Sequence, residues 1–216
     1  MRRRFDEQID LLNQGMIEMG ALVEKTIEDA CEAMGTGNLP LARAIMAGDA
    51  QVDRKEREIE SLCLHLLLQQ QPVARDLRQI SSALKMITDM ERIGDQAADI
   101  SEIVTVMDLS HPRPGHFRPM ARAAIDMVHR AIDAYVHQDV ALAQQVMASD
   151  DIVDGLFMNV KTELAELLAQ SPDRSQEALD LLMIAKYFER IGDHAANIAE
   201  WVVYSVTGLY KGEELQ

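Results

Sequence analysis

Acidic side chains recur at helical spacing in two related stretches of the chain. In the first stretch four carboxylates stand four, four and three residues apart, so on a helix that turns about 100° per residue they share one face. In the second stretch an asparagine replaces one of the four. The two stripes consist of Glu91, Asp95, Asp99 and Glu102, and of Glu189, Asp193, Asn197 and Glu200.

An acidic pair with the same interval precedes each stripe. Asp49 with Asp53 comes before the first, and Asp150 with Asp154 comes before the second. Like charges four residues apart on a helix repel each other by roughly 0.2–0.5 kcal/mol, so we expect something to offset that repulsion. Hard divalent and trivalent cations prefer oxygen ligands, and carboxylates from two neighbouring helices can hold them. The pattern therefore predicts a cation site on the outer surface of each half.

An ordinary solvated acidic face is the alternative interpretation. The spacing (E/D)xxxD is common in acidic helices. Arg92 with Asp95, and Arg190 with Asp193, stand three residues apart and could neutralise part of the charge. The spacing alone leaves both interpretations open.

A glycine interrupts both stripes at the same place. Gly94 and Gly192 each stand between the glutamate and the aspartate, where glycine costs about 1 kcal/mol relative to alanine in a helix. Close approach of a neighbouring helix is the usual reason for such a residue, and close approach of a ligand is the other.

Residues suited to catalysis are scarce. A di-iron bundle needs Glu-x-x-His pairs, which the sequence lacks, and it also lacks a glycine-rich phosphate loop, a nucleophile elbow and a zinc-type Cys/His spacing. His194, matched by Gln96 in the first stripe, is an optional ligand or a surface residue. His65 lies in an apolar run, which favours a hydrogen-bonded core or interface histidine. We predict that the protein is not an enzyme.

The elements that position these stripes are long helices separated by prolines, which are tolerated in a first helical turn but break a helix interior. Apolar residues recur at helical spacing between the prolines, which predicts helices of roughly 25 to 35 residues. Asn38 is an expected N-cap region, and the chain also breaks at Gln138-Asp139 and at 171–173. The prolines are Pro40, Pro72, Pro112, Pro114, Pro119 and Pro172.

An internal duplication organises the chain. The segment 89–100 recurs at 187–198, and both copies contain Glu-Arg-Ile-Gly-Asp. Half of the prolines gather in the intervening segment HPRPGHFRP. We predict an all-α fold, a tandem duplication of a three-helix bundle with six long helices. The first repeat would span 1–110, the linker 111–119 and the second repeat 120–216.

An apolar seam runs along the third helix of each repeat, away from the acidic stripe. Its residues alternate spacings of four and three, which is typical of helices packed in a left-handed bundle. We therefore predict that the seam is core. Its members are Met86, Met90, Ile93, Ala97, Ile100, Val104 and Met107, and Ile184, Phe188, Ile191, Ala195, Ile198 and Val202.

Composition narrows the class of protein. The chain has 216 residues, with 21 Lys+Arg against 36 Asp+Glu, and its net charge of −15 argues against a nucleic-acid partner. The hydrophobic fraction of 48% with only 4% aromatics favours a helical protein over a strand-rich one. Cys31 and Cys63 form no CxxC pair, so we expect reduced thiols. Without a signal-peptide pattern or an apolar span, a cytoplasmic protein is expected.

Three segments together carry a family signature. They are RDLR at 75–78, ITDMERIGD at 87–95 and YFERIGDH at 187–194. The sequence resembles the PhoU family of phosphate-transport regulators from Phe5 to about Gly212. The resemblance implies paired three-helix bundles, commonly dimeric, that act in the bacterial cytoplasm as a non-enzymatic negative regulator of the phosphate-starvation response. Such a protein relays the state of a phosphate ABC transporter, through its ATPase subunit, to a membrane sensor histidine kinase and restrains excess uptake.

The resemblance also implies metal ligands, because some members of the family bind iron, zinc or other divalent or trivalent ions through (E/D)xxxD motifs. The neutral oxygen ligand Asn197 stands where the first copy has Asp99, so the two sites are expected to differ in charge and occupancy. The motif carries over onto Asp49 with Asp53, Glu91 with Asp95 and Asp99, Asp150 with Asp154, and Glu189 with Asp193 and Asn197.

Two alternatives to the regulator remain open. One is a metal-storing or metal-dependent helical protein whose carboxylate stripes act directly. The other is a PhoU-like accessory to a different phosphate carrier, or a redundant paralogue.

Overall fold

The computed structural model describes residues 2–70, 73–211 and 213–214, and α-helices make up nearly all of this part of the chain. Pro72 lies outside the described residues. The all-α fold with six helices is confirmed. The elements are α1 (Arg2–Thr36), α2 (Leu39–Gln70), α3 (Ala74–Val106), α4 (Phe117–His137), α5 (Val140–Gln170), η1 (Pro172–Arg174), α6 (Ser175–Thr207), β1 (Leu209–Tyr210) and β2 (Glu213–Glu214).

Short polar side chains start two of the helices. Leu41 N donates to Asn38 Oδ1 at 3.1 Å, which confirms Asn38 as the cap of α2. Leu142 N donates to Asp139 Oδ1 at 3.0 Å at the start of α5. Because Gln138 takes the left-handed conformation with φ 52°, α4 ends after 21 residues and is shorter than the predicted 25 to 35.

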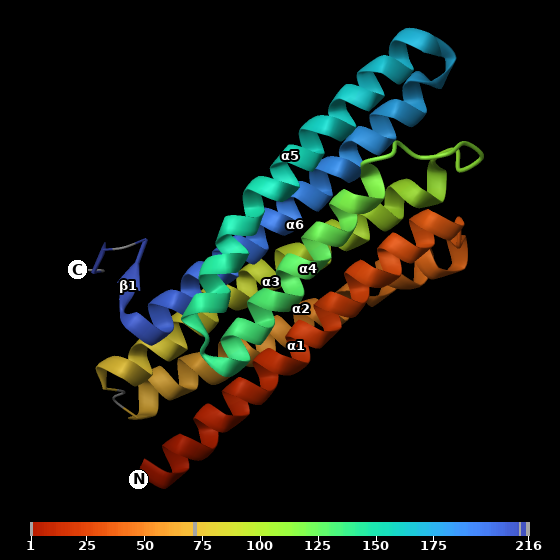
Figure 1. Ribbon diagram of the computed structural model, residues 1–216. Coiled ribbons are helices and arrows are strands. Elements are labelled where there is room, and N and C mark those ends of the chain that lie inside the picture. The colour runs from red at the N-terminus through yellow and green to blue at the C-terminus, as the bar shows by residue number, and fades with distance from the viewer. Residues whose placement is uncertain (1, 71–72, 212, 215–216) are drawn as a thin grey trace.

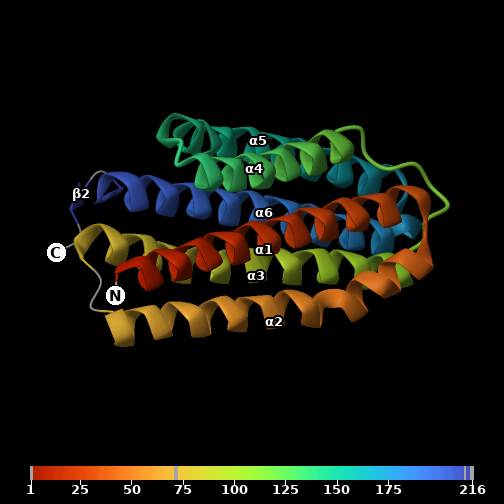
Figure 2. The same ribbon diagram turned by 90° about the horizontal axis from the view of Figure 1, so that it is seen from below.

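The helices form two three-helix groups that lie side by side (Figure 1). Helices α1, α2 and α3 pack against one another, as do α4, α5 and α6, and contacts of α3 with α6 and of α1 with α4 join the groups. Figure 2 shows α2 and α5 at opposite edges, with α3 and α6 between them. The third helix of each group is therefore packed on several sides.

The predicted apolar seams form the core. All thirteen seam residues are buried. The rings of Phe117 on α4 and Phe188 on α6 meet edge to face with centroids 6.2 Å apart. Since these faces of α3 and α6 point inward, the acidic residues occupy what remains of each helix surface.

Charged side chains hold the segment between the two groups. Arg174 donates to both carboxylate oxygens of Glu177 at 2.7 and 2.8 Å, and His111 Nδ1 lies 3.1 Å from Glu177 Oε2. Glu177 is only 5% exposed. Helix α4 begins at Phe117, so the last three residues of the expected linker are helical, with Pro119 in the first turn.

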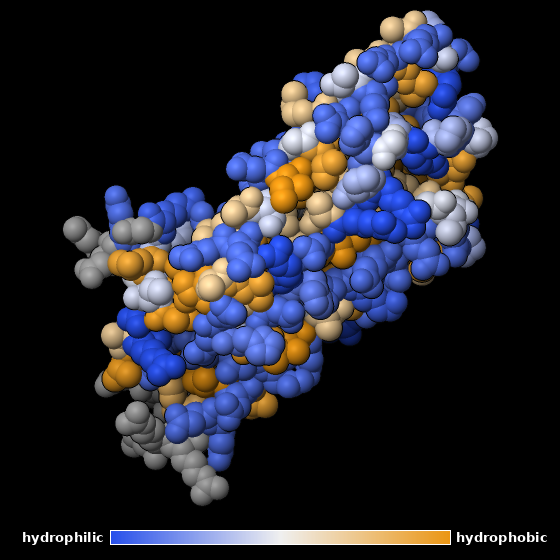
Figure 3. Space-filling model, in the orientation of Figure 1, coloured by the Kyte–Doolittle hydropathy of each residue, from blue (hydrophilic) through white to orange (hydrophobic). Residues whose placement is uncertain are grey.

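A two-residue hairpin follows α6. Strands β1 and β2 pair antiparallel, with Leu209 opposite Glu214 and Tyr210 opposite Glu213. The ring of Tyr210 stacks on Trp201 of α6 at a centroid distance of 4.4 Å, which fixes the hairpin against the helix. Hydrophilic residues dominate the face in Figure 3, with hydrophobic patches between them. In the described part of the chain, no helix has the length and hydropathy needed to cross a bilayer.

Candidate metal-binding sites

Two glycines bring the acidic stripes close to a neighbouring helix. A methyl group at Gly94 would lie 3.1 Å from Cγ1 of Val52 on α2, and one at Gly192 would lie 3.3 Å from Cγ1 of Val153 on α5. Both distances are tighter than ordinary contacts, so a larger residue would push the helices apart. Of the two explanations considered for these glycines, close helix packing accounts for both.

The carboxylates of α2 and α3 meet beside Gly94. Burial raises the pKa of Asp49, and nearby carboxylates, Asp95 first, raise it further. Burial also raises the pKa of Glu91, with Asp95 again the strongest neighbouring charge. The acidic pair on α2 and the acidic stripe on α3 thus act on each other across the helix pair. We call this group the α2/α3 cluster; it contains Asp49, Asp53, Glu56, Glu91, Asp95 and Asp99.

The equivalent group lies between α5 and α6. Burial, followed by the charges of Asp193 and Asp154, raises the pKa of Asp150 to about 6. Burial and then Glu189 raise the pKa of Asp193. The four residues Asp150, Asp154, Glu189 and Asp193 are called the α5/α6 cluster below.

Compensation by positive charge differs between the clusters. Lys186 Nζ donates to both carboxylate oxygens of Glu189 in the α5/α6 cluster. The equivalent position in the first repeat is Thr88, which brings no charge. On α2, Arg57 Nη2 lies 3.8 Å from Asp53 Oδ2. The α2/α3 cluster is therefore richer in carboxylates, and its positive charge comes from arginines at longer distances.

The arginines of the repeated motif neutralise less charge than their spacing suggests. Arg92 Nε lies 3.6 Å from Glu91 Oε2. Neither an Arg92–Asp95 nor an Arg190–Asp193 ion pair forms among the described residues, although both stand three residues apart. Uncompensated negative charge therefore remains in both clusters.

The chemistry of the donors fits a hard cation. Every ionised donor in the two clusters is a carboxylate oxygen. Burial first, and then repulsion between neighbouring carboxylates, raises the pKa of Asp49 and of Asp150, and a bound cation would offset both effects. Within the described residues, no three His, Cys, Asp or Glu side chains already form a group that could hold a metal ion. The side chains would have to reorient on binding, and the metal remains a prediction.

Each half of the chain matches the same known protein family. The family model for the PhoU domain matches residues 16–104 and again residues 117–202. The chain belongs to the PhoU family. The α2/α3 cluster therefore lies in the first PhoU domain, and the α5/α6 cluster lies at the equivalent place in the second.

Curated relatives match over nearly the whole chain. The phosphate-specific transport system accessory protein PhoU homolog of Clostridium acetobutylicum is 32% identical over 210 residues, covering 96% of both chains. The protein of the same description from Pseudomonas aeruginosa is 32% identical over 209 residues, covering 95% of this chain and 86% of its own.

Two solved structures share the fold. The crystal structure of PhoU from Pseudomonas aeruginosa matches with a TM-score of 0.90 and 33% identity, over 95% of this chain and 100% of that one. The phosphate transport system regulatory protein PhoU from Streptococcus pneumoniae matches with a TM-score of 0.88 and 25% identity, over 95% and 98% of the two chains.

The two PhoU domains meet at a polar contact that the sequence did not single out. His194 Nδ1 on α6 lies 2.8 Å from Asp89 Oδ1 on α3, and Asn197 Nδ2 donates to the same oxygen at 3.2 Å. His194 is therefore a half-buried residue between the domains. Asn197, a predicted ligand, is engaged with Asp89 in this structure. The only hint in the sequence is that His194 replaces Gln96 of the first copy.

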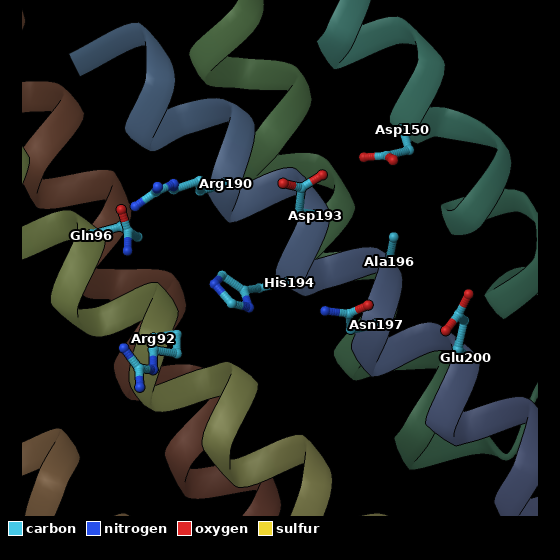
Figure 4. Close-up of a pocket in the computed structure, with 9 residues that line it drawn as sticks. All are labelled: Arg92, Gln96, Asp150, Arg190, Asp193, His194, Ala196, Asn197 and Glu200. Carbon is cyan, nitrogen blue, oxygen red and sulfur yellow. The ribbon is translucent and has the colours of Figure 1, made fainter. Parts of the chain in front are cut away.

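A cavity of about 550 Å³ opens beside this contact, where α3 meets α6 (Figure 4). Gln96 from α3 is only 7% exposed, and its Oε1 has no hydrogen-bond partner. Figure 4 shows Arg190 extending from α6 toward Gln96. Since Asp150 and Asp193 also line this cavity, it is continuous with the α5/α6 cluster of the second PhoU domain.

Proposed function

We propose that this chain is a regulatory accessory protein of a high-affinity phosphate ABC transporter. It restrains phosphate uptake and keeps phosphate-responsive genes repressed when phosphate is ample. The observation that carries this proposal is the pair of PhoU domains spanning the chain, shared with relatives described as accessory proteins of phosphate-specific transport.

The regulator works by contact rather than by catalysis. It acts in the cytoplasm as a homodimer, binding the ATPase subunit of the transporter and a membrane sensor histidine kinase. Long helices packed on a continuous core support this role, because a rigid bundle can carry two partners on separate faces.

Cations at the two carboxylate clusters form the second part of the proposal. Asp49, Asp53, Glu91, Asp95 and Asp99 would hold iron, zinc or another divalent or trivalent ion in the first PhoU domain. Asp150, Asp154, Glu189 and Asp193 would hold one in the second, with Asn197 as an additional neutral ligand. A bound cation supplies positive charge that offsets carboxylate repulsion across each helix pair.

Deletion of the gene tests the regulatory role. Alkaline phosphatase output in phosphate-rich medium should rise in the deletion strain, and a plasmid copy of the chain should restore repression. Unchanged output together with unchanged phosphate uptake contradicts the proposal. Altered uptake with unchanged output favours an accessory of a different phosphate carrier.

Metal storage is the second candidate function, favoured by the uncompensated charge of both clusters. Metal analysis of protein purified without chelators should compare Glu91→Ala and Glu189→Ala with Glu102→Ala, an exposed control outside the clusters. Variants that lose metal yet still repress would separate the clusters from the signalling surface. Variants that lose both would link them.

A further inference from the structure

A second cavity, remote from the carboxylate clusters, lies where the two halves of the chain meet. Its volume is about 780 Å³, within the usual range for small-molecule sites. One wall comes from the C-terminal part of α1, and the other from the segment before α4 and the first turns of α4. Figures 1 and 2 both show this segment passing the end of α1.

Three arginines line this cavity. In the part of the chain that the structure describes, Arg113, Arg118 and Arg122 form no ion pair. The charges of Glu177 and Asp108 nevertheless act on Arg113. Arg113 donates through Nη1 to the carbonyl of His111, but its Nε is buried without a hydrogen-bond partner. Three guanidinium groups around one cavity concentrate positive charge in a chain whose net charge is −15. Their fork of N–H donors matches the oxygens of a phosphate group.

The rest of the lining combines an apolar surface with hydrogen-bond acceptors. Pro114 and Ile125 are half-buried and offer an apolar surface to a flat ring, whereas Met34 and Phe117, at 5% and 1% exposed, contribute little of that surface. Glu28 and Glu32 line the α1 wall and are exposed to solvent. Their carboxylates can accept hydrogen bonds from hydroxyl or amino groups but repel a bare anion.

We propose that this cavity binds a nucleotide, with its phosphates held by Arg113, Arg118 and Arg122 and its base against Pro114 and Ile125. Glu28 and Glu32 accept hydrogen bonds from the sugar hydroxyls or from an amino group of the base. A fatty acid lacks groups that could satisfy these carboxylates, and inorganic phosphate leaves the apolar surface uncovered.

The position of the cavity gives such a ligand a structural consequence. Helix α1 belongs to the first PhoU domain and α4 to the second, so a bound nucleotide contacts both. It would therefore stabilise one arrangement of the two domains, since a ligand shifts an equilibrium toward the state that it binds better. The inference is independent of the carboxylate clusters.

Calorimetric titration of the full chain with AMP, ADP, ATP and GTP, with pyrophosphate as the anion alone, tests the proposal. We expect one site per chain for at least one nucleotide and markedly weaker binding of pyrophosphate. Arg118→Gln with Arg122→Gln should weaken nucleotide binding at least about tenfold. Both arginines are exposed, so the fold should survive, and Arg43→Gln with Arg54→Gln on α2 is the matched control.

Cys31 supplies an independent readout, because it lines the cavity within electrostatic reach of Arg118 and Arg122. A bound nucleotide should slow its alkylation several-fold, whereas Cys63 is fully buried and burial raises the pKa of its thiol to about 12. The proposal is overturned if none of the four nucleotides binds, if pyrophosphate binds as tightly, if the double variant binds like the control, or if Cys31 is not protected.

Discussion

Asp150 is the residue of the α5/α6 cluster whose ionised form is most clearly disfavoured by its surroundings. Its pKa is raised from 3.8 to about 6, first by burial and then by the carboxylates around it. A raised carboxyl pKa in the folded state means that stability falls as the pH rises from about 4 to about 6. At pH 7 its charge therefore opposes folding of the metal-free protein.

Replacing Asp150 by asparagine should have opposite effects with and without metal. In chelator-treated protein at pH 7, Asp150→Asn should raise the free energy of unfolding by about 1 kcal/mol, since partial exposure screens the repulsion. The rise in melting temperature caused by added zinc or iron should become smaller. Thermal melts should include Glu166→Gln, an exposed acid further along α5, as the control. Lower stability of metal-free Asp150→Asn would refute this assignment of repulsion.

Glu177 presents the opposite case, a carboxylate stabilised by its surroundings. The hydrogen bonds from Arg174 hold its pKa below the ordinary value of 4.5, with smaller contributions from His111 and Arg113. A lowered folded-state pKa contributes stability above pH 4.5 that is lost as the pH falls through the folded-state value. This side chain therefore links α6 to the segment between the two PhoU domains more strongly when it is ionised than when it is protonated.

Melting curves across pH can test that role. Glu177→Gln should melt below the wild type at pH 7, and the difference should shrink steadily below about pH 4.5 as the wild-type carboxylate protonates. Asp180→Asn, which removes a carboxylate one turn further along α6, is the control. A difference that stays constant down to pH 3 would show that the charge is not what matters.

At the scale of elements, the glycines decide how close the paired helices come. Gly94→Ala places a methyl group 3.1 Å from a β-branched valine that has little rotameric freedom, so it should destabilise the protein by about 1–3 kcal/mol. Gly48→Ala on α2 meets no atom within 4 Å and should stabilise it by about 0.5–1 kcal/mol through helix propensity. Denaturant unfolding measures both, and equal gains from the two substitutions would contradict the close approach.

The periodicity of the sequence was sufficient to predict the elements and the core seams. The 3.6-residue period and the capping residue Asn38 are local signals, and the structure confirms them. The sequence marks Asp139 only as part of a break, and the structure shows that it caps α5. Helix α4 is shorter than predicted because Gln138 adopts a left-handed conformation, and few signals in a sequence mark such a residue. The C-terminal hairpin was missed because tertiary contacts hold it: Tyr210 stacks on Trp201, and Lys211 Nζ lies 3.4 Å from Glu200 Oε2.

At the scale of the whole molecule, the contact of Asp89 with His194 tests how firmly the domains are joined. Changing Asp89→Asn, His194→Gln and both together should give a coupling free energy of about 1 kcal/mol in a double-mutant cycle of unfolding. Glutamine is the residue at the equivalent position 96. A coupling of zero would mean that other contacts hold the domains together, among them the hydrogen bond from Tyr135 Oη on α4 to Asn13 Oδ1 on α1 at 2.8 Å.

That contact also shows where prediction from sequence ended. Asp89 and His194 are 105 residues apart, and nothing local indicates which face of α3 meets α6. The same holds for Glu177, whose partners come from the inter-domain segment as well as from its own turn. The two carboxylate clusters were predictable because the acidic residues of each one lie on consecutive helices, and the duplication repeats the pattern.

Direct binding of this chain to its two proposed partners tests the central claim. The full chain should be immobilised and exposed to the purified ATPase subunit of the phosphate transporter and to the cytoplasmic part of the sensor kinase from the same organism. The account predicts saturable binding of both, and no binding of an ATPase subunit from an unrelated ABC transporter. Binding of neither partner, in the metal-free or the metal-loaded protein, would contradict the account.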